Sequence, residues 1–76
     1  MPKLPRPTGK EMVRFLEQQG FSVIRIQGSH HILVRNVLRT NVPVHGTRTL
    51  KIGTLRGILR DIDMTPEKFA ERWEQS

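Results

Sequence analysis

Four side chains able to act on a phosphodiester fall close together in the middle of the sequence. Arg25 precedes the pair Gly28-Ser29, His30 and His31 follow it directly, and His45 comes later in the chain. Imidazole titrates near neutrality, so it can take a 2′-hydroxyl proton or protonate a leaving 5′ oxygen of RNA. A nearby cation stabilises the charge that develops on phosphorus. These residue types suit RNA cleavage, although histidines in such positions can also be half-buried strand residues whose nitrogens are satisfied.

The histidines are a poor match to a metal site. His30 and His31 are adjacent, so in a strand their rings leave opposite faces and cannot share an ion. His30 with His45 supplies only two nitrogen ligands, and no carboxylate or thiolate is expected beside them. We therefore expect neither a metal nor another cofactor.

These residues fall in a segment whose apolar residues alternate with a period of two. "FSVIRIQ" (21–27) and "HHILVRN" (30–36) are joined by Gly28-Ser29, a glycine-first pair that suits a two-residue hairpin turn. "VLRT" then leads into "TNVPVH", where Pro43 donates no ladder hydrogen bond and so favours a sheet edge. The pattern predicts a three-stranded antiparallel meander.

Placing the second turn at Val37-Leu38 gives a full register, with Ile24 opposite Leu33 and His30 opposite His45. The expected core face holds Ile24, Ile26, His31, Leu33, Val42 and Val44. The expected open face holds Val23, Arg25, Gln27, His30, Ile32, Val34, Asn41 and His45. On this register His30 and His45 are cross-strand neighbours near Arg25.

Helices are predicted on both sides of the meander. Thr8-Gly9-Lys10-Glu11 forms a capping box for a helix that Gly20 ends. A second amphipathic helix begins within 51–54, and Thr65-Pro66 begins a short closing helix. Lys51 lies at the entry to the second helix, where helix N-terminal donors favour phosphate. The order α-β-β-β-α-α predicts an α+β fold with the helices on one face of the sheet.

Charge is unevenly distributed along the 76 residues. Residues 1–60 hold eleven Lys and Arg against two Glu, a net +9, whereas residues 61–76 carry a net −3. A basic body is typical of a protein that binds a phosphate backbone. The chain has no cysteine, and we expect residues 1–7 to be a flexible basic arm and 8–76 to be a single domain.

Several motifs in this order resemble the HicA-like (YcfA-type) family of bacterial and archaeal mRNA-interferase toxins. The most specific is Gly28-Ser29-His30, supported by Pro43-Val44-His45, "GTLRGILRDI" (53–62) and "MTPEKF" (64–69). The resemblance covers roughly residues 8–73. It implies a fold similar to the double-stranded-RNA-binding domain.

The resemblance also implies what this chain does. Members of this family cleave mRNA and are inhibited by a partner antitoxin, HicB, and their essential histidine directly follows Gly-Ser. His30 is therefore the expected catalytic residue, supported by Gly28, Ser29 and His45, with Arg25 and Lys51 binding RNA. The expected partners are mRNA and a HicB-like antitoxin.

Two further readings of the sequence stay open. A non-catalytic RNA-binding module and a basic docking protein would share this fold and charge. The four aromatic residues offer no sheet face for stacking bases, which disfavours single-strand binding by stacking. The start of the chain lacks the apolar core of a signal peptide, and no apolar run approaches membrane-spanning length, so we expect a cytoplasmic protein without membrane contact.

Overall fold

The computed structural model describes residues 4–76 and contains three helices and one three-stranded sheet over that range. The elements follow the order α1 (Gly9–Gln18), β1 (Ser22–Gln27), β2 (His30–Arg35), β3 (Leu38–Pro43), α2 (Ile52–Asp61) and α3 (Pro66–Gln75). Neighbouring strands are antiparallel and lie in the order β1-β2-β3. The predicted α+β class and meander are confirmed, and Pro43 does lie in an edge strand.

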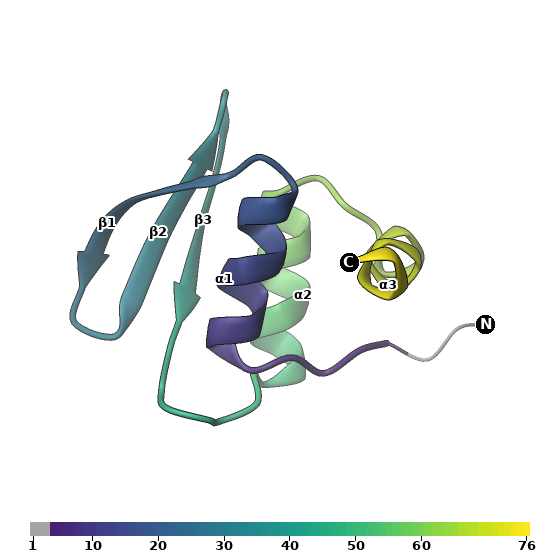
Figure 1. The fold of residues 1–76 in the computed structure, drawn as a ribbon, viewed down its shortest axis with the longest axis horizontal. Coiled ribbons are helices and arrows are strands. Elements are labelled where there is room, and N and C mark those ends of the chain that lie inside the picture. The colour runs from purple at the N-terminus through teal and green to yellow at the C-terminus, as the bar shows by residue number, and fades with distance from the viewer. Residues whose placement is uncertain (1–3) are drawn as a thin grey trace.

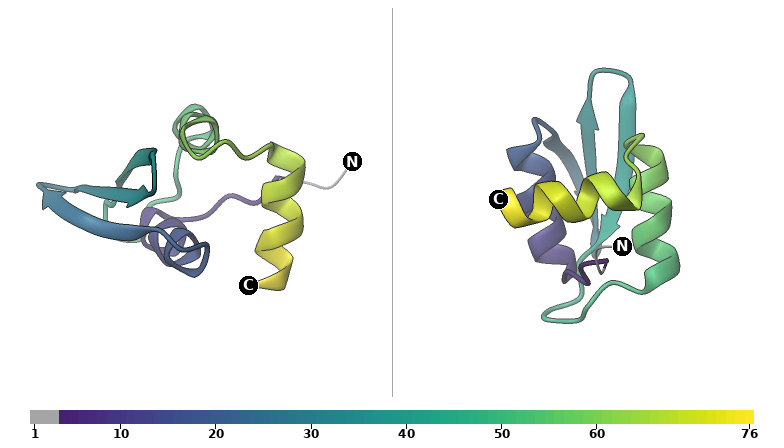
Figure 2. Two further views of the ribbon diagram at one scale, coloured as in Figure 1. Left: turned by 90° about the horizontal axis from the view of Figure 1, so that it is seen from above. Right: turned by 90° about the vertical axis from the view of Figure 1, so that its right-hand side faces the viewer.

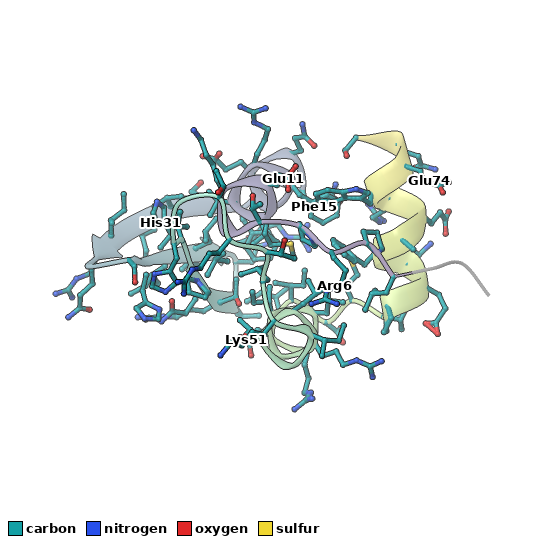
Figure 3. The ribbon with its side chains drawn as sticks, turned by 90° about the horizontal axis from the view of Figure 1, so that it is seen from below. Arg6, Glu11, Phe15, His31, Lys51 and Glu74 are labelled. Carbon is teal, nitrogen blue, oxygen red and sulfur yellow. The ribbon has the colours of Figure 1, made fainter. Side chains whose placement is uncertain are left out.

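The elements form three layers. The sheet is one layer, α1 and α2 cover one of its faces, and α3 runs across α1 and α2 on the side away from the sheet (Figures 1 and 2). Phe15 of α1 contacts Phe69 and Trp73 of α3, with ring centroids 5.1 and 5.6 Å apart. Figure 3 shows Phe15 directed toward α3. All helices therefore lie on one side of the sheet and leave its other face open.

The start of α1 is fixed by the predicted capping box and by a close contact with β3. Thr8 Oγ1 accepts a hydrogen bond from the Glu11 backbone N–H at 3.1 Å, and Glu11 Oε1 accepts one from the Thr8 N–H at 2.9 Å. A Cβ added to Gly9 would lie 2.2 Å from the backbone oxygen of Pro43. Glycine at this position thus lets the helix pack against the end of β3.

The first hairpin turns at Gly28-Ser29 as predicted, but β1 contains a bulge that the sequence pattern did not predict. Gln27 pairs with His30 and Ile26 with His31, whereas the register shifts between Val23 and Arg25. Val23 therefore lies opposite Leu33, and the prediction that Ile24 would do so is wrong. The extra residue reverses the alternation upstream of it.

The bulge and the edge position of β1 together decide which of its side chains are buried. Ile24 and Ile26 are 58% and 60% exposed, so their assignment to the core is wrong. Val23, expected on the open face, instead packs against the core together with Leu33 and Val42. Leu33 and Val42 are fully buried, as expected.

The second hairpin turns one residue earlier than predicted. Arg35 pairs with Leu38, so the turn residues are Asn36 and Val37, and β3 shifts by two residues relative to the expected register. Asn36 adopts φ 55°, a left-handed conformation that asparagine tolerates better than most residues. Asn36 thus provides the left-handed conformation of this turn, which contains no glycine.

Residues 4–7 of the expected arm pack against the domain, while residues 1–3 lie outside the described part of the chain. Leu50 N–H donates to the Pro7 carbonyl at 2.8 Å, and the Arg6 guanidinium donates to the Leu50 carbonyl at 3.2 Å. Pro7 is fully buried and Leu4 contacts the core. These contacts hold the N-terminal segment beside the loop that leads into α2.

Each helix in residues 4–76 falls short of the length and apolar character needed to cross a membrane.

Candidate active site on the open sheet face

His30 is the first residue of β2 and its ring is exposed on the sheet face opposite the helices. Its Nδ1 lies 2.9 Å from Oδ1 of Asn41 on β3. A carboxamide oxygen only accepts hydrogen bonds, so this contact assigns the Nδ1 proton to the neutral ring. The unprotonated Nε2 then carries a free lone pair, which is the form a general base requires.

The register gathers cationic and polar side chains around His30. Arg25 lies opposite Ile32, which in turn lies opposite Asn41, and all three share the face of His30. Arg39, opposite Val34, lies on the same face and is exposed. The open face therefore presents one oriented imidazole, with Arg25 in the neighbouring cross-strand row and Arg39 one row further along. Below, "open face" means the following exposed side chains: Arg25, Gln27, His30, Arg39 and Asn41.

His45 does not lie opposite His30, and the predicted cross-strand pair is wrong. Because the second hairpin turns at Asn36-Val37, Pro43 is the residue that faces His30. β3 ends there, and His45 lies in the exposed loop that follows. The expected two-histidine site is replaced by a His30–Asn41 pair.

His45 instead borders a basic hollow beside the start of α2. This hollow has a volume of about 280 Å³ and is lined by Pro43, His45, Arg48, Thr49, Leu50, Lys51 and Thr54. Lys51, labelled in Figure 3, is the N-cap of α2. Its side chain makes no capping hydrogen bond there. The first backbone N–H groups of a helix have no partner within the helix and favour anions. Pro43 belongs both to the hollow and to the row of His30, so the two features are adjacent.

Gly28 and Ser29 set the position of His30 through the backbone. Gly28 has φ 61°, which a glycine adopts at no steric cost, and Ser29 completes the turn. The Ser29 carbonyl accepts a hydrogen bond from the Val44 N–H at 2.7 Å. The turn is thereby tied to the end of β3, next to the hollow.

His31 lies on the helix side of the sheet, as alternation predicts, and is partly buried. It faces Val42 across the β2–β3 pair. Its Nδ1 is buried and has no hydrogen-bond partner among the described residues. The paired histidines thus have different environments: His30 meets solvent, and His31 is part of the packing.

No group of three or more His, Cys, Asp or Glu side chains positioned to hold a metal ion occurs within residues 4–76.

Sequence reasoning missed three residues of this region. Asn41 was placed on the open face but given no role, because the expected register paired His30 with His45. Arg39 and Arg48 were assigned to no site. The exposed basic side chains flanking "TNVPVH" were the signal that could have found Arg39 and Arg48.

The fold and the site together define a class: a small basic α+β domain with helices on one face of a three-stranded sheet and an oriented histidine on the other. Residues 9–64 match the family described as "HicA toxin of bacterial toxin-antitoxin". The match covers most of the chain and ends before α3. The chain therefore belongs to the HicA family of toxins of bacterial toxin–antitoxin systems. No curated protein is significantly similar to it in sequence.

Proposed function

We propose that this toxin is a metal-independent endoribonuclease that cleaves mRNA, with His30 as its catalytic residue and a HicB-like protein as its antitoxin. The observation that carries the proposal is the 2.9 Å contact between His30 Nδ1 and Asn41 Oδ1 on an exposed, cationic sheet face. It leaves Nε2 of the neutral ring directed away from Asn41 and available to substrate. His30 is also the histidine that follows Gly-Ser in the motif typical of the family.

The chemistry follows from these positions. Nε2 of His30 takes the proton of a ribose 2′-hydroxyl, and the resulting oxygen attacks the adjacent phosphorus. The O2′–P bond forms as the P–O5′ bond breaks, and the leaving oxygen takes a proton from solvent. The products are a 2′,3′-cyclic phosphate and a 5′-hydroxyl end. Arg25, in the row next to His30, supplies positive charge that stabilises the phosphorane oxygens, and Arg39 contacts the RNA strand further along the face.

RNA binding is assigned to two adjoining surfaces. The open face contacts the scissile phosphate, and the hollow with Arg48 and Lys51 contacts a neighbouring phosphate of the same strand. Phosphate contacts of this kind hold the backbone in register without reading the base sequence. Gly28, Ser29 and Asn41 position His30, and His45 contributes positive charge to the hollow when it is protonated.

A single assay separates this proposal from its alternatives. Purified chain is incubated with a labelled RNA in the presence of EDTA, and the products are resolved on denaturing and native gels. We expect cleavage without added metal. A mobility shift without cleavage would instead identify a non-catalytic RNA-binding module, and neither result would identify a docking protein. Activity that returns only with Mg²⁺ would refute the metal-independent mechanism.

A further inference from the structure

The outer edge of β1 is an unpaired strand edge that carries exposed apolar side chains. β1 is hydrogen-bonded to β2 only, and no other described segment lies beyond its outer edge (Figures 1 and 2). Ile24 and Ile26 of this strand are more than half exposed. Natural proteins normally protect such edges with charge, proline or a covering element. Two isoleucines on an open edge therefore indicate a surface that another strand covers.

The backbone of β1 has the geometry that an added strand needs. Gln27 and His30 flank a two-residue turn, so they form the hydrogen-bonded closing pair of the hairpin. Alternation makes Ile26 and His31 the next, non-hydrogen-bonded pair. The N–H and C=O of Ile26 consequently point away from β2, toward the open edge. The bulge at Ile24 limits the regular edge to the few residues near the turn.

The basic side chains near the outer edge of β1 indicate which kind of strand can pair with it. Arg25 lies on this strand, and Lys10 and Arg14 are exposed on α1, which contacts β1. A second copy of this chain would bring its own Arg25 to the same junction, where like charges destabilise pairing. A strand with acidic side chains would instead bring opposite charge to Arg25 and to the nearby basic residues of α1.

We propose that the outer edge of β1 binds an extended acidic segment of the antitoxin as a fourth strand of the sheet. Strand addition of this kind gains affinity from main-chain hydrogen bonds and specificity from alternate side chains. A strand added here would lie beside Arg25 and Gln27, at the border of the open face that carries His30. The inference rests on the proposed toxin–antitoxin pairing for the identity of the partner, and not on RNA cleavage.

The test uses a defined probe, a capped heptapeptide of alternating valine and glutamate, titrated into the isotope-labelled full chain and followed by NMR. We expect the amide signals of residues 24–27 to shift and the exchange of the Ile26 amide with solvent to slow. The same peptide with lysine in place of glutamate should leave them unchanged. Shifts confined to other elements, or none at millimolar peptide, would overturn the proposal.

Two controls separate strand pairing from general attraction between an acidic peptide and a basic protein. In an extended peptide the valine N–H groups point to one edge and the glutamate N–H groups to the other, so N-methylation of either set blocks one edge. One of the two N-methylated peptides should therefore lose binding entirely. Ile26→Thr keeps the β-branched shape and should weaken binding about fivefold through lost apolar contact. Val37→Thr, at a residue that is 95% exposed in the other hairpin, should not. Equal binding by both N-methylated peptides would contradict a backbone-paired strand.

The antitoxin itself is tested in a purified complex of this chain with a HicB-like antitoxin. The Ile26 amide should exchange more slowly in the complex than in the free toxin. An unprotected Ile26 amide in a stable complex would overturn the assignment while leaving the nuclease proposal intact. Failure of the RNA assay would in turn leave the strand-pairing result intact.

Discussion

His30 and His31 have different environments because they are consecutive residues of the same strand. Consecutive strand residues point to opposite faces, so one ring meets solvent and Asn41, while the other lies against the helices. A pair of histidines in sequence therefore does not make a pair in space. The proposed catalytic role therefore falls to His30, and His31 belongs to the packing.

Replacing His30 should remove activity without unfolding the protein. His30→Ala is expected to abolish RNA cleavage and to change the free energy of unfolding by less than about 0.5 kcal/mol, because the ring is exposed. The measurements are single-turnover cleavage and urea denaturation. His31→Ala is the matched control: it should cost about 1 kcal/mol of stability and keep cleavage per folded molecule. The reverse pattern would mean that the roles of the two rings are exchanged.

Replacing Asn41 should alter how His30 works rather than whether the protein folds. Asn41→Ala removes the acceptor for Nδ1–H, and we expect the cleavage rate constant to fall on the order of tenfold with little change in RNA affinity. Asn41→Asp keeps an acceptor and adds a negative charge, which favours the imidazolium form. The acid limb of the pH–rate profile should therefore move to higher pH in Asn41→Asp. An unmoved profile would show that Asn41 has only a structural role.

At the scale of the elements, local signals in the sequence predicted helix starts and turns correctly wherever one residue type determines the backbone geometry. The Thr8–Glu11 capping box and the Gly28-Ser29 turn are where the pattern puts them, and α2 begins at Ile52, inside the predicted window. These features depend on backbone chemistry within a few residues.

The errors lie where the result depends on contacts between distant parts of the chain. The pattern around Ile24 and Ile26 is an ordinary alternation, and nothing local indicates the bulge at Ile24. Ile26 pairs with His31 as predicted but is exposed in the edge strand. Asn36 and Val37 carry a weak turn signal, and both turns leave Leu33 and Val42 on the helix side of the sheet, so the pattern of apolar residues does not distinguish them. The observed turn displaced His45 from the site and brought Asn41 beside His30.

The approach of α1 to β3 gives a stability test with an internal control. The methyl group added by Gly9→Ala would overlap the Pro43 carbonyl oxygen. We therefore expect the free energy of unfolding to fall by about 1–3 kcal/mol. Gly57→Ala, in α2 with no neighbouring atom within 4 Å, should stabilise the protein by up to about 1 kcal/mol. Thermal and urea denaturation measure both. A stabilising Gly9→Ala would contradict the observed packing.

At the scale of the whole molecule, the side of the sheet that the helices leave free carries positive charge, and the three strands contain no Asp or Glu. The helices cover one face with the core, and Arg25 and Arg39 occupy the other. The acidic residues fall mainly in 61–76, which form the end of α2 and α3. The fold therefore separates charge between the sheet and the outer helix layer.

This separation predicts which arginines matter for RNA. Arg39→Glu should weaken binding of a non-cleavable RNA about tenfold and reduce its salt dependence, because a phosphate contact on the open face is lost. Arg56→Glu makes the same charge change on α2, where Arg56 lines a different surface hollow with Arg60, and should have a smaller effect. Fluorescence anisotropy across a salt series measures both. Equal losses would show that net charge alone governs binding.

The central claim is that His30 activates a ribose 2′-hydroxyl, and the products of cleavage test it most directly. Wild-type protein is incubated in EDTA with an RNA cleaved at one site and with the same RNA carrying a 2′-O-methyl group at that nucleotide, and the ends are identified by mass spectrometry. The account predicts 2′,3′-cyclic phosphate and 5′-hydroxyl ends from the first RNA and no cleavage at the methylated position. Cleavage of the methylated nucleotide, or products with 5′-phosphate ends, would contradict it.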